Sequence, residues 1–339
     1  MFGPFIYTCD RSIEVYNETK KYIEATKYAE EIEILGWAYH SIGDIIPHTN
    51  ENLFSGHFFP WQESWDELQI SFNLCLFGLY KQAMVSLRSG LEVGLLSVYW
   101  NLHDDGHIVI REWLVSQQDT PRFSEIWKRL ERHNNFRIFQ QTYDVKSRLL
   151  SLGYLHDYVH TKGFKYSNQM GIMKSNFQTF EERGFNTWFE SFREVIQVLA
   201  ILHLVKYPLG VIRYDYKKKF GIYKPMFGGL ETFEIDRLEQ VIGREAFNAI
   251  ENMAKSDTAV QDILEWVSSF PDMTEEDMQE QIVEFDKQMI ERQGLEKWLE
   301  QEKMLMGDRF AQSEAHKRKV QYLIEWAQEN GFDKPAWKR

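Results

Sequence analysis

Apolar residues recur at every third or fourth position along most of this chain, and that spacing predicts amphipathic helices. The few prolines lie between the periodic segments, as they do in mainly helical proteins, because proline interrupts a helix. We therefore predict an all-α protein. Helices are expected over residues 12–41, 61–80, 81–102, a segment starting at 120–121, 137–160, 186–207, 233–255, 258–270, 274–306 and 312–330.

Residues 211–230 interrupt this helical pattern. The letters VIRYDY alternate between apolar and polar and predict a short strand, and Gly228-Gly229 predicts a turn. A chain of 339 residues is also longer than one ordinary core. We therefore expect an N-terminal helical bundle over 1–210, a linker over 211–230 and a helical C-terminal domain over 231–339.

The negative charge is concentrated in the C-terminal region. Residues 1–230 carry 25 basic and 26 acidic side chains, whereas residues 231–339 carry 14 and 25. Ser256–Asp286 holds ten acidic residues and no lysine, arginine or histidine. Such a segment repels phosphate backbones, so no nucleic acid is expected to bind there. It is either a solvated helix face or a docking element that covers a basic cleft or binds a basic partner. In the more basic tail, Trp326 and Trp337 are candidate interface anchors or core residues.

Several classes of protein do not fit the sequence. Cys9 and Cys75 form neither a metal-binding spacing nor a disulfide framework, which favours a reducing cytoplasm. The N-terminus lacks a signal-peptide pattern, and the longest apolar run, VIQVLAILHLV, is too short to span a bilayer. The phosphate-binding loop, the dinucleotide-binding glycine motif and the GxSxG motif are all absent. We expect a cytoplasmic protein without a membrane partner, a DNA partner or a cofactor.

The segment over 81–102 is apolar around nearly its whole circumference, which predicts a central helix. Ser86, Gly90 and Gly94 form a stripe of small residues at four-residue spacing, where another helix can approach closely. Arg88 and Glu92 also lie four positions apart, in otherwise apolar surroundings. Because an unpaired buried charge is costly, the pair is either an internal ion pair that fixes helix register or a functional pair that lines a cleft.

The stretch GYLHDYVHTKG places His156 and His160 on one helix face. Three interpretations are open. Zinc binding would follow the HExxH pattern, but Asp157 replaces the glutamate and no third ligand follows at the expected spacing unless Glu92 or Glu181 folds nearby. Metal-free cleavage of RNA would use a histidine to activate the ribose 2′-hydroxyl and an arginine to stabilise the charged phosphorane. The third interpretation is a pair of helix-end histidines bonded to terminal carbonyls.

Taken together, LYKQAMVSLRSGLEVGLLSVYW, a further helix and RLLSLGYLHDYVHTKG resemble the HEPN superfamily over about Trp61–Tyr207. The resemblance implies a bundle of four or five helices that often dimerises. It also implies a metal-independent ribonuclease of the kind found in toxin–antitoxin, abortive-infection and other antiviral systems. The family's signature is an arginine, four to six intervening residues and a histidine. Here Arg148 precedes His156 by seven intervening residues and His160 by eleven, so folding must supply the cation from Arg88 or Arg148.

The leading hypothesis is a defence or toxin-type component that acts on RNA as a homodimer. In it His160 is the general base, assisted by His156, and Arg88 and Arg148 face the phosphate while Glu92 orients Arg88. No metal is assigned. The alternative is a non-catalytic HEPN-like interaction module whose bundle and acidic helices assemble a larger complex.

Overall fold

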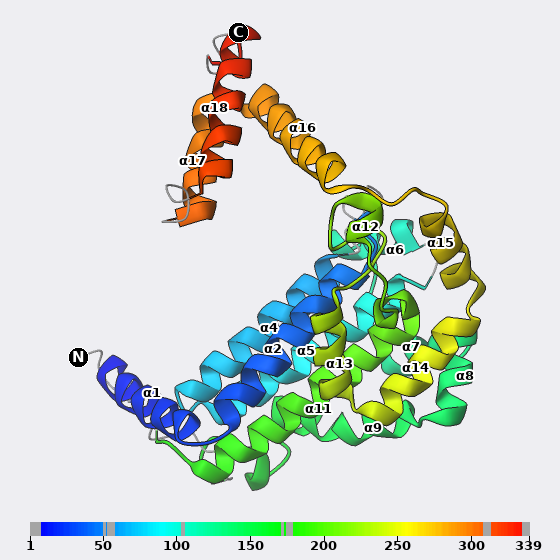
Figure 1. The fold of residues 1–339 in the computed structure, drawn as a ribbon. Coiled ribbons are helices and arrows are strands. Elements are labelled where there is room, and N and C mark those ends of the chain that lie inside the picture. The colour runs from blue at the N-terminus through cyan, green and yellow to red at the C-terminus, as the bar shows by residue number, and fades with distance from the viewer. Residues whose placement is uncertain are drawn as a thin grey trace. The chain divides into compact units, whose positions relative to one another are not determined.

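The computed structural model of the protein describes residues 8–49, 52, 58–102, 106–170, 173, 179–307 and 313–333. Throughout these residues the regular secondary structure is helical, which confirms the predicted all-α class (Figure 1). None of the helices in these ranges is long and apolar enough to cross a membrane. The α-helices are α1 (Cys9–Glu24), α2 (Tyr28–Ile45), α4 (Phe59–Leu76), α5 (Tyr80–Trp100), α6 (Gly106–Leu114), α7 (Phe123–Leu130), α8 (Asn134–Thr142), α9 (Val145–Ser151), α10 (Leu155–Val159), α11 (Glu182–Lys206), α12 (Lys217–Phe220), α13 (Thr232–Ile242), α14 (Arg244–Ser256), α15 (Thr258–Ser268), α16 (Glu275–Gln293), α17 (Leu295–Met306) and α18 (Glu314–Glu329).

The strand expected at VIRYDY is wrong, because the described residues contain no strand. Pro208–Val211 form a short 3-10 turn, η3, and the residues that follow are irregular. Arg213 does not lie beside another extended segment. Its guanidinium instead pairs with Asp236 (2.7 Å) and Glu239 (3.1 Å) of α13. The alternation of apolar and polar residues here reflects a segment that lies across a helix.

Several of the expected long helices are divided. The segment over 137–160 forms α8, α9, a 3-10 turn η1 (Leu152–Tyr154) and α10. Between α13 and α14 the chain turns at Gly243 (φ 84°), and between α16 and α17 it turns at Gly294 (φ 91°). Glycine adopts these angles without the steric cost that a Cβ atom imposes, so each glycine lets a new helix begin in another direction.

The chain divides into two compact units. The larger comprises Met1–Tyr214 and Lys224–Trp266, and the smaller comprises Asp215–Tyr223 and Val267–Arg339. This division differs from the boundary expected at 211–230. Buried residues of α13 and α14, among them Leu238 and Ile250, belong to the same core as α2 and α11.

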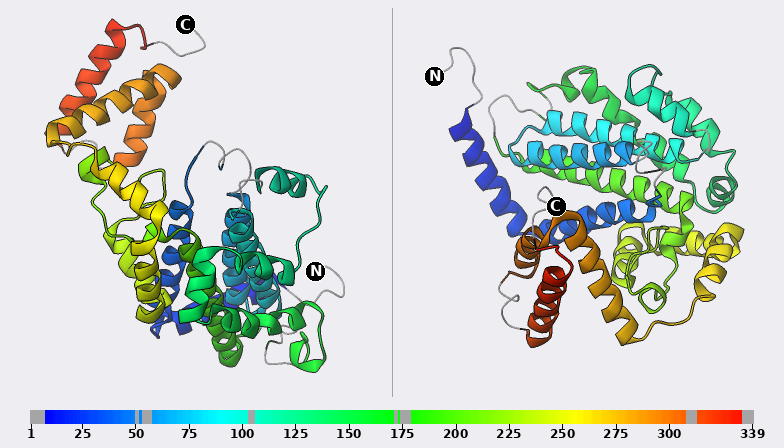
Figure 2. Two further views of the ribbon diagram at one scale, coloured as in Figure 1. Left: turned by 90° about the vertical axis from the view of Figure 1, so that its right-hand side faces the viewer. Right: turned by 90° about the horizontal axis from the view of Figure 1, so that it is seen from above.

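The larger unit is built around α5 and α11. These two helices and α4 run side by side (Figure 2), and α4 and α5, which are separated by only three residues, form an antiparallel hairpin. The small residues of α5 permit the close packing: Ser64 of α4 donates a hydrogen bond to the carbonyl of Gly90 (2.7 Å). A Cβ atom built on Gly94 would lie 2.7 Å from a methyl carbon of Leu199 on α11. The stripe of small residues is therefore a packing feature.

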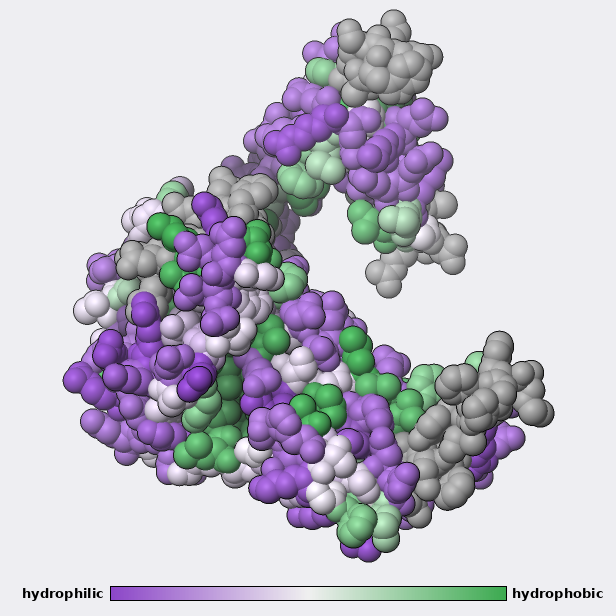
Figure 3. Space-filling view, turned by 180° about the vertical axis from the view of Figure 1, so that it is seen from behind, coloured by the Kyte–Doolittle hydropathy of each residue, from purple (hydrophilic) through white to green (hydrophobic). Residues whose placement is uncertain are grey.

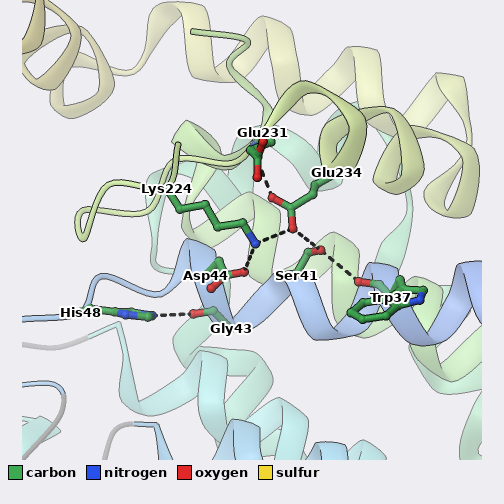
Figure 4. A network of polar contacts seen from close by, with 8 residues as sticks. All are labelled: Trp37, Ser41, Gly43, Asp44, His48, Lys224, Glu231 and Glu234. Atoms are coloured by element: carbon green, nitrogen blue, oxygen red, sulfur yellow. Dashed lines mark hydrogen bonds and ion pairs between the residues drawn. The ribbon is translucent and has the colours of Figure 1, made fainter. Parts of the chain in front are cut away.

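A polar network ties the residues after α12 back to α2 (Figure 4). The Lys224 ammonium contacts Asp44 (2.8 Å) and Glu234 (2.7 Å), and Ser41 donates a hydrogen bond to Glu234 (3.1 Å). Burial opposes the charge of Lys224, but its hydrogen bonds to the two carboxylates outweigh burial and raise its pKa. The Glu234 carboxylate is 4% exposed, so its charge must be compensated inside the protein.

His203 is fully buried in α11, where burial lowers its pKa to about 4. One ring nitrogen, Nδ1, lies 2.8 Å from the carbonyl of Leu199, which can only accept, so Nδ1 carries the proton and donates. The other nitrogen, Nε2, lies 3.2 Å from the hydroxyl of Ser97 and accepts from it. The ring is therefore held in one neutral tautomer.

This buried neutral histidine makes stability depend on pH. Below pH 6.5 the unfolded chain takes up a proton that the folded chain does not, so the free energy of unfolding falls as pH drops toward 4. We expect a loss of about 3 kcal/mol over that interval, at 1.36 kcal/mol per pKa unit. Urea denaturation of the wild type and of His203→Gln, which does not titrate, measures the difference. Parallel pH profiles for the two proteins would contradict this expectation.

The smaller unit has its own core, formed by α16, α17 and α18 around Trp298 and Leu323. The Asp286 carboxylate is buried there and accepts hydrogen bonds from the Trp298 indole (3.0 Å) and the Lys319 ammonium (2.7 Å). Trp326 packs partly buried against this core, and Trp337 lies outside the described residues. The acidic residues over 256–286 thus include one buried structural carboxylate.

Candidate functional site

The larger unit contains a pocket of about 690 Å³ whose lining residues come from α5, α6, α7, α9, η1, α10 and the segment before α7. Most of its wall is apolar, formed by leucines of α5 and α9 together with Phe123 and Ile126 of α7. Its charged or titratable lining residues are Arg88, Glu92 and His156. On the face that Figure 3 shows, hydrophobic residues lie among hydrophilic ones, and the pocket residue Leu150 is 54% exposed.

Arg88 and Glu92 form an ion pair on successive turns of α5. The Arg88 side chain is 19% exposed and that of Glu92 is 55% exposed, so the pair lies at the wall of the pocket and not in the core. Burial lowers the pKa of Arg88, and the neighbouring Glu92 carboxylate opposes that shift. Arginine stays protonated in proteins, so the pocket contains a guanidinium already held in place by a carboxylate.

The two histidines share a face, as the spacing predicts. His156 lies within the five-residue helix α10, His160 caps its C-terminal end, and the ring centroids are 4.2 Å apart. Helix α10 packs against α5, so His156 lines the pocket with Arg88, whereas His160 is not among the lining residues. Within the described part of the chain neither imidazole bonds to a carbonyl, so the helix-end interpretation lacks the contacts that define it.

The same ranges contain no group of three histidine, cysteine, aspartate or glutamate side chains placed to hold a metal ion. The zinc interpretation therefore lacks its third ligand in the described ranges. Asp157, the counterpart of the HExxH glutamate, pairs with Lys162 (3.4 Å). Asp157 is not among the residues that line the pocket.

The chain turns sharply after the histidines. Thr161 has φ 47°, a left-handed conformation that β-branched residues rarely adopt. Its hydroxyl accepts a hydrogen bond from the Lys81 ammonium at the start of α5 (2.5 Å), and the backbone N–H of Lys162 donates to the carbonyl of Asp157 (3.0 Å). Strained residues of this kind persist where surrounding contacts hold them and cluster at functional sites. The turn fixes the end of α10.

Arg148 has a different environment from Arg88. Its guanidinium forms a bidentate pair with Glu194 of α11 (both contacts 2.7 Å) and further hydrogen bonds with Tyr143 (2.5 Å) and Gln197 (2.7 Å). Burial opposes its charge, but the hydrogen bonds to Glu194 outweigh burial and raise its pKa. Arg148 does not line the pocket. These contacts hold α9 against α11.

Sequence reasoning missed the opposite wall of the pocket. This wall, which lies across the pocket from α5, is formed by Trp113 of α6, the Thr120-Pro121 segment and α7. The available signal was the FSEIWKRL pattern of α7, which is strongly amphipathic and starts just after the helix start predicted at residues 120–121. Comparisons of the chain with protein-family models, curated protein sequences and solved structures found no match.

Proposed function

We propose that the larger unit is a HEPN-like bundle that acts on RNA as a metal-independent endoribonuclease, within a homodimeric defence or toxin-type component. One observation carries the proposal: Arg88 and Glu92 of α5 and His156 of α10, distant in sequence, line the same pocket. Histidine is the side chain suited to exchange protons near neutral pH, and a fixed guanidinium stabilises developing phosphate charge.

In the proposed reaction, His156 accepts the proton of the ribose 2′-hydroxyl. The 2′-oxygen attacks the adjacent phosphorus, the bond from phosphorus to the 5′-oxygen breaks, and solvent protonates the departing oxygen. The products are a 2′,3′-cyclic phosphate and a 5′-hydroxyl. Arg88 faces the phosphate oxygens and Glu92 holds its guanidinium. His160 supports the neighbouring ring.

The proposed division of roles follows from the position of the two rings. Attacking and leaving oxygens lie on opposite sides of the phosphorus in an in-line displacement, so two rings only 4.2 Å apart cannot serve both oxygens. His156, which lines the pocket with Arg88, takes the role of base. This reverses the order expected from the sequence, in which His160 led.

The direct test is incubation of the purified protein with end-labelled RNA in EDTA. The proposal predicts cleavage at an unchanged rate when EDTA is present, with 2′,3′-cyclic phosphate and 5′-hydroxyl ends. Cleavage that requires a divalent cation, or that leaves 5′-phosphate ends, would contradict the mechanism. RNA that stays intact with every candidate partner present would contradict the function itself.

A second function, a non-catalytic interaction module, is favoured by the apolar wall of the pocket. Apolar pockets of this kind bury apolar groups of a ligand or partner, and the charge of Arg88 is already balanced by Glu92. Mass measured in solution by light scattering separates the two proposals. An interaction module loses its assembly when Leu150 is changed to glutamate and keeps it when His156 is changed to alanine.

A further inference from the structure

A second pocket of about 460 Å³ adjoins the first in the larger unit. Thr120 and Pro121 line both pockets, so this segment is their common wall. The wall is fixed by the Trp113 indole, which donates a hydrogen bond to the Thr120 hydroxyl (3.0 Å). Trp113 lines the first pocket and Trp100 the second, and their ring centroids are 4.6 Å apart. A ligand that extends past this wall reaches both pockets.

Three cations line the second pocket: Lys128 and Arg129 of α7 and Arg132 just beyond it. Within the described ranges none of the three forms an ion pair with a carboxylate, in contrast to Arg88 and Arg148. Lys128 and Arg132 are exposed, whereas Arg129 is half-buried. Among the described residues, these side chains therefore present positive charge without a paired carboxylate.

Two carboxylates also line this pocket. The Glu125 side chain accepts a hydrogen bond from the backbone N–H of Arg122 (2.8 Å), so it serves the N-terminal cap of α7. Asp119 lies on the shared-wall segment. The three cations outnumber these two carboxylates, so the described lining residues carry a net positive charge.

Aromatic rings and unpaired donors complete the pocket. The Arg129 guanidinium lies over the Tyr99 ring, 5.7 Å from its centroid. Arg129 Nε and Trp100 Nε1 are both buried without a hydrogen-bond partner in the described ranges. Buried donors without acceptors cost free energy, and both of these donors belong to residues that line the pocket.

We propose that this second pocket binds phosphate groups of single-stranded RNA and directs the strand into the first pocket. The identity of the strand as RNA rests on the proposed function, whereas the phosphate chemistry rests on the cations. Guanidinium groups match phosphate oxygens in geometry and charge. Tyr99 beneath Arg129 offers a ring on which a base can stack, as in other single-strand sites.

The test measures the affinity of a fluorescent 2′-fluoro RNA dodecamer, which lacks the nucleophilic 2′-hydroxyl. Lys128→Glu and Arg132→Glu are each expected to weaken binding at least tenfold. Arg137→Glu is the matched control: it makes the same charge change on α8, and Arg137 is exposed, lies outside the pocket and donates a side-chain hydrogen bond to Asn134. We expect this control to lose less than threefold. Lys128→Arg and Arg132→Lys should retain binding.

Salt dependence provides a readout that misfolding would not imitate. Each lost phosphate contact should make the slope of log K against log salt concentration less negative by about 0.7 for a single strand. The slope of Arg137→Glu should match the wild type. Equal losses in all three glutamate variants, an unchanged slope in Lys128→Glu and Arg132→Glu, or a wild type that binds no phosphate ligand would overturn the site.

Competition by adenosine monophosphate distinguishes the source of the phosphate. Displacement of the RNA by the mononucleotide identifies a nucleotide site, and resistance to it identifies a strand-backbone site; in both cases the phosphate pocket stands.

Because the 2′-fluoro strand cannot be cleaved, binding and cleavage are measured separately, and each of the two proposals can be refuted without the other. Binding that depends on Lys128 without cleavage of natural RNA refutes the ribonuclease, and cleavage with normal binding by Lys128→Glu refutes the phosphate site.

Discussion

His156→Ala is expected to lower the rate of RNA cleavage at least about 100-fold, the usual contribution of a positioned general base. His156 lines the pocket with Arg88, and it is the only histidine among the described residues that line it. The measurement is single-turnover cleavage of a labelled RNA in EDTA. RNA affinity should change little, because an exposed imidazole at the pocket wall contributes mainly to the chemical step.

His160→Ala is the matched control for this prediction. The two residues belong to the same short helix end and are both exposed, but His160 is not among the residues that line the pocket. Its removal should cost less than about tenfold, because it deletes a ring contact and not the base. Equal loss in the two variants, or a greater loss in His160→Ala, would restore His160 as the base and contradict the assignment made here.

Gly94→Val is expected to destabilise the larger unit by about 3 kcal/mol, at the upper end of the usual range for an overpacked core. A Cβ atom at Gly94 would lie 2.7 and 2.8 Å from the two methyl carbons of Leu199 and 2.9 Å from the hydroxyl oxygen of Ser64. These neighbours belong to α11 and α4, which enclose α5. Urea denaturation measures the free energy of unfolding.

Gly153→Ala serves as the control for this steric argument. A Cβ atom at Gly153 meets nothing within 4 Å, and its backbone conformation suits an ordinary residue. The control should be neutral or more stable by up to about 1 kcal/mol, since alanine restricts the unfolded chain. If Gly94→Val proved as stable as this control, the close packing of α4, α5 and α11 would be wrong.

Much of the central architecture could be predicted from the sequence, because it depends on residue patterns within single helices. The apolar circumference of α5 and its stripe of small residues predicted a central helix that another helix can approach closely. The positions where helices break were harder to predict. Gly243 and Gly294 are ordinary letters in an amphipathic pattern, and only packing against neighbouring helices decides whether the chain turns there.

The site was predicted in part. Two polar segments distant in sequence were expected to converge, and Arg88 and His156 do line one pocket. Which histidine faces that pocket depends on the breaks before α9 and α10, and periodicity does not reveal them. Arg148 contacts Glu194 only because α9 and α11 meet across the core. A single sequence offers no local signal for that contact, or for the place of the α7 cations beside the second pocket.

A crystal structure of the protein with the 2′-fluoro RNA dodecamer would test the proposed RNA site most directly. The proposed function predicts a phosphate within hydrogen-bond reach of the Arg88 guanidinium and the adjacent 2′-position facing the His156 imidazole. It predicts further phosphates beside Lys128 and Arg132. A strand bound on another surface, or the pocket of α5, α7 and α10 filled by an apolar group of a partner, would contradict it.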